Sequence, residues 1–360
     1  MRASVLGCGA VGSRAARMLA EAGLEVVAVD ANPSALASVE RAEGVEALVE
    51  DLSSPQALRR LMSGFDVACD CLPSRLGFKV MRAAVEEGAR LVSVSYVAED
   101  PLTLNEEAER AGALIIPDCG LAPGLSNVLA GRAYAELKEL GELHVRVGAI
   151  PSTPKPPLRH AATWNLADLL DEYVRPARII RGGRVVKVDP LSTVVHVWVG
   201  GVGLLEGFFS DGLRTMLKTI KAHEMDELTL RHRGHLASMK ALAELGLLSG
   251  TAGPRRLLED LLREAWRGFI DDLLILEVEA VGVEGGRSLS RLVSMDAVDP
   301  PLLKATAAAC STAALMAARG ELSGGGVHPP ELIGMSEAAY ASFIKGLEGK
   351  GLKVERSQLS

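Results

Sequence analysis

The chain has few aromatic residues and no surplus of basic ones. Phe, Trp and Tyr make up 4% of its 360 residues, so aliphatic side chains and alanine must fill its cores. Lys and Arg number 39 against 46 Asp and Glu, and this negative balance argues against nucleic-acid binding. No run of 18 apolar residues occurs, so we expect no membrane span. The length favours two domains over one.

Cysteine is also scarce, and the five cysteines have neither zinc-site spacing nor a CxxC redox motif. The seven histidines are scattered, so no metal site is predicted. The first apolar run begins close to Met1, which leaves no room for a signal peptide. Together with reduced thiols, this predicts a cytoplasmic protein. The small number of Asn and Gln is typical of thermophile proteins.

A glycine motif follows the first apolar run and opens a helical stretch. An acidic residue, Asp30, closes the next apolar run, which completes the strand–turn–helix–acid pattern of a dinucleotide site. Glycines at these positions permit the tight turn and the close approach of a pyrophosphate. The Asp30 carboxylate would accept hydrogen bonds from ribose hydroxyls and repel a 2′-phosphate, so the cofactor is predicted to be NAD. The predicted phosphate loop comprises Gly7, Gly9, Ala10, Val11 and Gly12.

Residues 1–123 alternate apolar runs with helical patterns. This predicts an α/β Rossmann domain with a doubly wound parallel sheet. Ligands of such sheets bind at the carboxyl ends of the strands. Asn127 serves either the cofactor or the turn in which it lies. The further cofactor-binding residues predicted at this edge are Asp51, Leu72, Pro73, Ser95 and Asn127.

Alternating runs with glycine turns begin near residue 141, with helices between them. They predict an α+β second domain at 124–301 with a largely antiparallel sheet, for substrate binding and oligomerisation. A helix rich in small residues, at 304–318, is expected to return to the Rossmann domain, which then comprises 1–123 and about 302–360. We expect a homo-oligomer, a dimer or higher, because most such assemblies are symmetric.

The segment Asp118–Asn127 resembles the saccharopine dehydrogenase-like superfamily of nicotinamide-dependent amine and amino-acid dehydrogenases. Segments such as Glu172–Arg178 and Ser210–Arg214 continue the resemblance in order, and the second domain most resembles L-lysine 6-dehydrogenases. The resemblance implies NAD-dependent oxidative deamination of the L-lysine ε-amine to 2-aminoadipate 6-semialdehyde, with release of ammonia and NADH. Saccharopine reductases typically carry an acid where Ala122 stands here, and they prefer NADP.

Amine dehydrogenation requires a neutral amine and an activated water, so groups that move protons are candidates for catalysis. Asp118 ends a strand and would hold the ε-ammonium or take its proton; the alternative is a helix cap. Tyr96 would hydrogen-bond the substrate or the carboxamide of the nicotinamide, or it simply packs. His160 and His235 are candidate proton shuttles, with core packing or capping as alternatives.

Substrate recognition requires a clamp for a carboxylate and a partner for an ammonium. Arg231 is the candidate clamp, because guanidinium binds carboxylates through two hydrogen bonds, and Arg175 is a rival. Asp211 would recognise an ammonium or cap a helix. Trp164 is expected to form a pocket wall.

Two other functions stay open. A saccharopine- or carboxynorspermidine-type dehydrogenase would act on a secondary amine and need two carboxylate clamps. A non-catalytic NAD-binding sensor would keep the glycine loop without turnover, because a fold does not determine a function.

Overall fold

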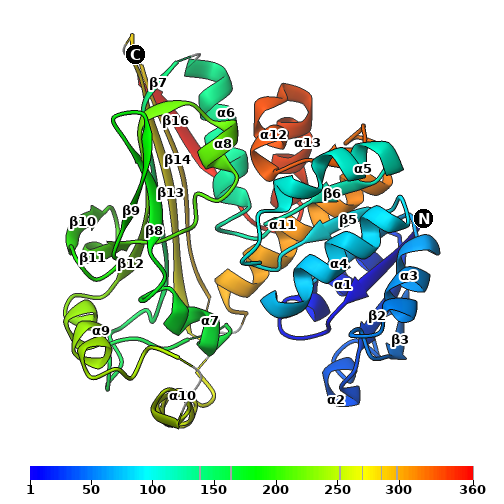
Figure 1. Cartoon of the computed structure of the whole chain (residues 1–360), viewed down its shortest axis with the longest axis horizontal. Helices are drawn as coiled ribbons and strands as arrows, with labels where there is room; N and C mark the ends of the chain where they lie inside the picture. Colours follow the sequence, from blue (N-terminus) through cyan, green and yellow to red (C-terminus); the bar gives the residue numbers. More distant parts are fainter. Residues whose placement is uncertain are drawn as a thin grey trace. The chain divides into compact units, whose positions relative to one another are not determined.

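The computed structural model describes residues 1–137, 139–162, 164–250, 253–269, 271–284, 286–296 and 299–359. The chain divides into two compact units (Figure 1). The first comprises Met1–Glu136 and Leu303–Lys353, and the second comprises Leu137–Leu302 and Val354–Ser360. The division differs from the predicted boundaries in two places. Helix α6 (Leu125–Leu137) belongs almost entirely to the first unit, and the final strand belongs to the second.

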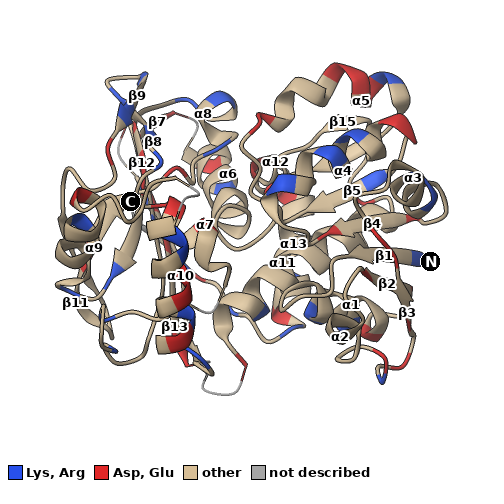
Figure 2. Cartoon of the chain, turned by 60° about the horizontal axis from the view of Figure 1, so that its bottom comes forward, with Lys and Arg blue, Asp and Glu red and all other residues tan. Residues whose placement is uncertain are grey.

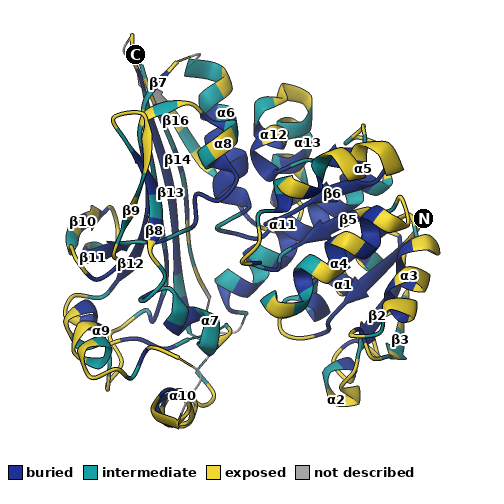
Figure 3. Cartoon of the chain, viewed as in Figure 1, coloured by how far each residue is buried: buried dark blue, intermediate teal, exposed yellow. Residues whose placement is uncertain are grey.

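The first unit contains a sheet of seven parallel strands in the order β15-β6-β5-β4-β1-β2-β3. This confirms the predicted Rossmann-like sheet. Strands such as β1 and β4 are almost wholly buried, as expected of a sheet covered on both faces (Figure 3). The strands are β1 (Arg2–Leu6), β2 (Glu25–Asp30), β3 (Val45–Val49), β4 (Val67–Asp70), β5 (Arg90–Ser93), β6 (Leu114–Ile116) and β15 (Gly326–Val327).

Some helices of the first unit begin at a capping residue, among them α2, α3 and α13. Asn32 accepts a hydrogen bond from the Ser34 backbone N–H, and Pro33 starts the helix that follows. The helices are α1 (Gly12–Glu21), α2 (Pro33–Leu36), α3 (Pro55–Ser63), α4 (Ser74–Glu86), α5 (Asn105–Ala111), α6, α11 (Pro301–Ala318), α12 (Pro330–Met335) and α13 (Glu337–Glu348), with a 3₁₀ turn at Pro101–Leu104.

Helix α11 is rich in small residues and groups with the first unit from Leu303 onward. The Cys119 thiol lies 4.0 Å from the Ala309 carbonyl oxygen, so α11 packs closely against the loop after β6. By length and hydropathy alone this helix is able to cross a membrane, but 72% of its apolar window is buried inside the protein. A helix with that much burial is typical of a protein core.

The second unit contains a nine-stranded mixed sheet, with a main path in the order β10-β11-β12-β7-β13-β14-β16. Its pairs are antiparallel except for β12 with β7, which confirms the predicted α+β class. The strands are β7 (Leu140–Ile150), β8 (Ala177–Arg181), β9 (Arg184–Val188), β10 (Val195–Val199), β11 (Gly203–Phe209), β12 (Ala222–Arg231), β13 (Asp272–Gly282), β14 (Arg287–Asp296) and β16 (Glu355–Leu359).

The second unit contains four helices, and three of them, α7, α9 and α10, contribute to an apolar cluster. The Arg255 guanidinium joins α10 to α7, because it lies 2.8 Å from the Asp171 carboxylate and also bonds to Glu259. Along α10, basic and acidic residues follow one another (Figure 2). The cluster beside these helices includes Leu169, Tyr173 and Phe208. The helices are α7 (Leu166–Asp171), α8 (Met216–Thr219), α9 (His235–Glu244) and α10 (Gly253–Ala265).

Candidate functional site

The glycine loop between β1 and α1 is tight at its two ends and open in the middle. Gly7 has a φ of 90°, and a Cβ on Gly12 would lie 1.8 Å from the Gly7 carbonyl oxygen. A Cβ on Gly9 would meet nothing within 4 Å. The loop therefore has the free space at Gly9 that a pyrophosphate needs, next to the N-terminus of α1. Ala10 and Val11, which lead into α1, are exposed and half-buried. These residues fit a nicotinamide dinucleotide.

Asp30 ends β2 with its carboxylate held against this loop. One carboxylate oxygen accepts from the Cys8 backbone N–H at 2.8 Å, and the other accepts from the Asn32 N–H at 2.8 Å. Each oxygen keeps a lone pair for a ribose hydroxyl. The negative charge therefore has a fixed position beside the predicted phosphate loop.

A buried carboxyl, Asp70, joins the loops that follow β4 and β5. Its oxygens accept from the Ser93 hydroxyl at 2.7 Å and from the Leu72 N–H at 3.0 Å. Ser95 in turn donates its hydroxyl to the Leu72 carbonyl at 2.8 Å. Burial raises the pKa of the Asp70 carboxyl. Ser95 thus helps to fix the loops at this edge of the sheet. Asp70 also fixes them, although the sequence did not predict it as a site residue; the signal that could have found it is an acid at the end of an apolar strand.

The other predicted rim residues also follow the carboxyl ends of neighbouring strands. Asp51 lies in an exposed turn after β3 and accepts from the Ser53 backbone N–H and hydroxyl, which lower the pKa of its carboxyl. Pro73 is exposed directly before α4, and Tyr96 is half-buried after β5. The sheet topology therefore gathers these residues along one edge of the first unit.

Asp118 and Asn127 lie in the segment after β6 with different surroundings. Asp118 is 1% exposed and has a φ of 51°, a left-handed conformation that Asp tolerates. It does not cap α6, which begins at Leu125. The buried Asn127 amide accepts from the Gly124 N–H at 3.0 Å and donates to the Glu331 carboxylate at 3.0 Å. Asn127 therefore belongs to the turn, the second of its two predicted roles.

The second unit buries a cation, Arg231, at the end of β12. Its Nε donates to the Tyr173 hydroxyl at 2.8 Å, Nη1 to the Leu230 carbonyl at 3.0 Å, and Nη2 to the Glu172 carboxylate at 3.0 Å. The guanidinium carbon also lies 5.6 Å from the ring centroid of Phe208. Since Arg231 is only 3% exposed, these contacts replace its lost hydration.

His235 continues this hydrogen-bond chain. Its Nδ1 lies 2.7 Å from the Leu158 carbonyl oxygen and so must donate, while its Nε2 accepts from the Tyr173 hydroxyl at 2.8 Å. Burial and the nearby Arg231 charge lower the pKa of His235 to about 3. His235 is therefore a neutral imidazole with both nitrogens in hydrogen bonds, and it holds Tyr173 in place beside Arg231. This arrangement favours the packing role over the predicted proton shuttle.

His160 lies beside His235, with ring centroids 5.0 Å apart. It is 1% exposed, and neither of its ring nitrogens has a hydrogen-bond partner among the described residues. Burial, with the Arg231 charge, lowers the pKa of His160 well below its ordinary value. Trp266 approaches it edge-on at 5.7 Å, and Trp164 packs half-buried on the same apolar cluster, as a wall residue would.

A second buried acid, Glu227, lies on β12 four residues before Arg231. Its Oε1 accepts from the Ser210 hydroxyl at 2.9 Å, while Oε2 has no partner within the described part of the chain. A Cβ on Gly212 would lie 1.8 Å from Oε1, so only glycine leaves room for this carboxyl. Burial, together with the charges of Glu172 and Asp211, raises the pKa of Glu227 to about 8.

The remaining predicted substrate residues lie around this cluster. Asp211 forms a two-point ion pair with Arg178, at 2.8 Å for each bond, and accepts the Arg178 backbone N–H as well. It does not cap a helix, since α8 begins at Met216. Arg175 is half-buried near Glu172; burial raises the pKa of the Glu172 carboxyl, and the charges of Arg231 and Arg175 oppose that rise. Tyr173, Glu172 and Glu227 also belong to this cluster, although the sequence did not predict them as site residues.

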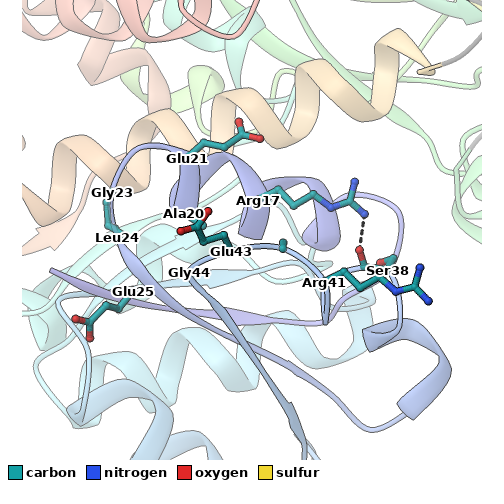
Figure 4. Close-up of a pocket in the computed structure, with 11 residues that line it drawn as sticks. Arg17, Ala20, Glu21, Gly23, Leu24, Glu25, Ser38, Arg41, Glu43 and Gly44 are labelled. Atoms are coloured by element: carbon teal, nitrogen blue, oxygen red, sulfur yellow. Dashed lines mark hydrogen bonds between the residues drawn. The ribbon is translucent and has the colours of Figure 1, made fainter.

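One surface pocket of about 730 Å³ lies away from all of these residues (Figure 4). Glu25 and Gly44, which line it, are at the amino-terminal ends of β2 and β3, whereas the predicted cofactor residues follow carboxyl ends. The pocket is therefore not the candidate cofactor site.

No group of three or more His, Cys, Asp or Glu within the described ranges is arranged to hold a metal ion.

Family models match most of the chain. Residues 4–116 match the saccharopine dehydrogenase NADP binding domain, and residues 120–352 match the saccharopine dehydrogenase C-terminal domain. The chain belongs to the saccharopine dehydrogenase family. This confirms the resemblance at the level of the superfamily and supports a nicotinamide cofactor.

Individual relatives agree with this family. The chain is 27% identical to the mitochondrial alpha-aminoadipic semialdehyde synthase of Bos taurus over 233 residues, which cover 61% of this chain and 25% of that one. It is 23% identical to the NADP(+), L-glutamate-forming saccharopine dehydrogenase of Saccharomyces cerevisiae over 234 residues, or 62% and 52% of the two chains. The chain thus spans about half or less of the length of these curated relatives.

A solved structure shares the fold over the full length. The apo saccharopine dehydrogenase (L-Glu forming) from Saccharomyces cerevisiae aligns with a TM-score of 0.78 and 16% identity, covering 100% of both chains. At this level of identity the match establishes the shared architecture of the saccharopine dehydrogenase fold.

The Asp30 carboxylate is expected to set cofactor preference. Asp30→Asn keeps an oxygen to accept one backbone N–H but removes the charge that would repel a 2′-phosphate. The affinities for NADH and NADPH are measured by fluorescence titration. The ratio of the NADH affinity to the NADPH affinity should fall at least tenfold. Glu87→Gln, an exposed acid at the C-terminal end of α4, is the control. An unchanged ratio in Asp30→Asn would show that Asp30 does not select the cofactor.

The raised pKa of Glu227 makes stability depend on pH. A carboxyl that keeps its proton up to about pH 8 in the folded state, but loses it near 4.5 when unfolded, stabilises the fold at low pH. That contribution is lost as pH rises from about 4.5 through 8. Urea unfolding should therefore show that Glu227→Gln becomes more stable relative to the wild type as pH rises from 5 to 9. A difference that is constant across this range would contradict the assigned shift.

Proposed function

We propose that this protein is an NAD-dependent dehydrogenase that oxidises the ε-amine of L-lysine. The products would be 2-aminoadipate 6-semialdehyde, ammonia and NADH. The glycine loop and Asp30 of the first unit would bind the cofactor, and the Arg231 cluster of the second unit would recognise the amino acid. Membership of the saccharopine dehydrogenase family supports the reaction class.

The choice of lysine is supported by the buried Glu227 carboxyl of the second unit. Its Oε2 atom has no partner among the described residues, whereas Glu172 and Asp211 are paired with Arg231 and Arg178. A cation bound beside this carboxyl would lower its raised pKa and pair with the resulting carboxylate, which favours a cationic substrate. Lysine carries two ammonium groups and one carboxylate, whereas saccharopine carries three carboxylates and would need further positive partners.

In the proposed mechanism, the bound nicotinamide supplies the hydride acceptor, and the protein orients the substrate and moves protons. Asp118 would take the proton that the ε-ammonium must lose before hydride transfer, and would then activate the water that adds to the imine. Tyr96 would donate a hydrogen bond at the same edge of the first unit. Ser95 and Asp70 would keep the surrounding loops in position.

A saccharopine-type dehydrogenase is the second candidate, favoured by the saccharopine dehydrogenases among the relatives and by the solved structure of one of them. It would act on a secondary amine, as would a carboxynorspermidine-type enzyme. A non-catalytic NAD sensor is the third. We also propose a cytoplasmic homo-oligomer that does not require a nucleic acid or a membrane.

Cofactor reduction with defined substrates separates these candidates. We expect absorbance at 340 nm to rise when L-lysine and NAD are added, and to rise more slowly with NADP. Saccharopine with the same cofactors is the parallel reaction. Turnover of saccharopine without turnover of lysine would replace the proposal with the second candidate, and turnover of neither would favour the sensor.

Asp118→Asn tests the proposed proton acceptor. The amide keeps the size of the side chain but cannot take a proton, so kcat for lysine should fall about 100-fold or more. The Kd for NAD, measured by titration, should stay within about twofold of the wild type. Glu99→Gln, an exposed acid of the same unit, is the control. A near-normal kcat in Asp118→Asn would show that Asp118 does not accept the proton and has only a structural role.

A further inference from the structure

A closed ring of hydrogen bonds links the loops that follow β4 and β5. The Asp70 carboxylate accepts from the Leu72 backbone N–H at 3.0 Å and from the Ser93 hydroxyl at 2.7 Å. The Ser93 hydroxyl oxygen accepts in turn from the Ser95 backbone N–H at 3.2 Å. The Ser95 hydroxyl then donates to the Leu72 carbonyl at 2.8 Å, which closes the ring. We call these four residues the Asp70 ring.

The Asp70 ring is buried, and its hydrogen bonds run in a fixed direction. Asp70 and Ser93 are fully buried, and Ser95 is 3% exposed. Helix α4 packs closely against the ring, since a Cβ on Gly77 would lie 2.5 Å from the Ser95 Cβ. Asp70 accepts at both of its oxygens, so a side chain without an acceptor at this position would open the ring in two places. Asp70 is therefore the residue that holds the two loops together.

The ring supports the segments that carry the proposed reacting groups. Tyr96 directly follows Ser95 in the chain. The backbone N–H of Cys119, the residue after Asp118, donates to the Ser93 carbonyl at 2.8 Å. Displacement of the ring would therefore displace the backbone beside both Tyr96 and Asp118.

The glycine loop has a support of its own. A Cβ on Gly12 would lie 3.2 Å from the Cys71 Cβ, so Cys71 packs against this loop. The Cys71 backbone N–H donates to the Leu6 carbonyl at 2.8 Å, beside the paired strands β1 and β4. This bond does not involve the ring. The phosphate side of the cofactor site is therefore fixed independently of Asp70.

The topology of the sheet assigns the ring to one half of a dinucleotide site. The chain lays down β1, β2 and β3 toward one edge of the sheet, and β4, β5 and β6 toward the other. A dinucleotide lies across such a reversal, with one nucleotide on each half. Asp30, the candidate partner of the adenosine ribose, ends β2. The ends of β4, β5 and β6 are then left for the nicotinamide nucleotide.

We propose that Asp70 is a positioning residue for the nicotinamide half of the cofactor. Through the ring it holds the loops after β4 and β5 in one arrangement, while other residues make the contacts. The proposal rests on the nicotinamide cofactor of the proposed function and does not depend on which amine is oxidised. Opening the ring should therefore weaken the nicotinamide half of the site and leave the adenosine and phosphate half intact.

Titration of the full chain with NADH and with ADP-ribose separates the two halves, because ADP-ribose lacks the nicotinamide ring. Asp70→Ala opens the Asp70 ring and should weaken NADH at least fivefold, whereas the Kd for ADP-ribose should stay within about twofold of the wild type. Asp70→Asn keeps one oxygen acceptor and should regain part of the NADH affinity. Calorimetry measures both ligands in the same way.

Matched variants separate the ring from general damage to the fold. Ser93→Ala opens the ring more mildly, and it should show the same selective loss even where Asp70→Ala does not fold. The double variant should lose at most about twofold more than Asp70→Ala, because the two side chains share one hydrogen bond. Ser4→Ala removes a buried hydroxyl that donates to the Leu61 carbonyl, outside the ring, and should bind both ligands as the wild type does.

Steady-state kinetics gives a second readout of positioning. With L-lysine and NAD, Asp70→Ala should lower kcat at least tenfold, because small misplacements of a reacting group slow the chemical step. The KM for L-lysine should stay within about threefold of the wild type. Loss of both parameters in equal measure would indicate damage to the substrate site and contradict the positioning role.

The outcomes that overturn the inference are distinct from those that overturn the function. Normal NADH affinity in the folded ring variants, or an equal loss for ADP-ribose, rejects the role of Asp70. Equal affinities of the wild type for NADH and ADP-ribose also reject it. The selective loss in a protein that forms no NADH from L-lysine rejects the proposed substrate and keeps the inference. A wild type that binds neither ligand rejects both.

Discussion

The buried guanidinium of Arg231 is the constraint on which the second unit depends. A cation removed from water must be compensated, and here a phenol oxygen, a backbone carbonyl and a carboxylate accept hydrogen bonds from three of its five N–H groups. Further hydrogen bonds fix these partners in turn. The Tyr173 hydroxyl accepts from Arg231 and donates to His235, and His235 donates to the Leu158 carbonyl. The cluster therefore holds one arrangement rather than several.

The first unit meets a different constraint, the close approach of backbone to backbone in its glycine loop. Gly12 has no space for a side chain against Gly7, while Gly9 faces open space. Asp30 and Asp70 then fix the neighbouring loops through hydrogen bonds to backbone N–H groups. The first unit thus presents backbone donors and a fixed negative charge suited to a dinucleotide, and the second unit presents buried paired charges.

The sequence predicted those parts of the fold and of the site that depend on short-range residue patterns. The parallel sheet, its glycine loop and the edge formed by strand ends follow from hydrophobic periodicity and turn residues, and the structure confirms the sheet. The full length of strand β12 does not follow from local pattern, because Glu224, Asp226 and Glu227 obscure its alternation. The roles of Tyr173 and Glu227 depend on partners distant in sequence, such as Ser210 for Glu227, which no local pattern reveals. Strand β16 is short and polar, so its pairing with β14 was also missed.

The proposed reaction transfers a hydride to NAD from the carbon that bears the ε-amine of L-lysine. It is tested by incubating L-lysine deuterated at C6 with NAD and analysing both products by mass spectrometry. We expect one deuterium in the NADH and one in the semialdehyde. NADH that forms without deuterium, or labelled lysine recovered intact with no NADH formed, would rule out this reaction.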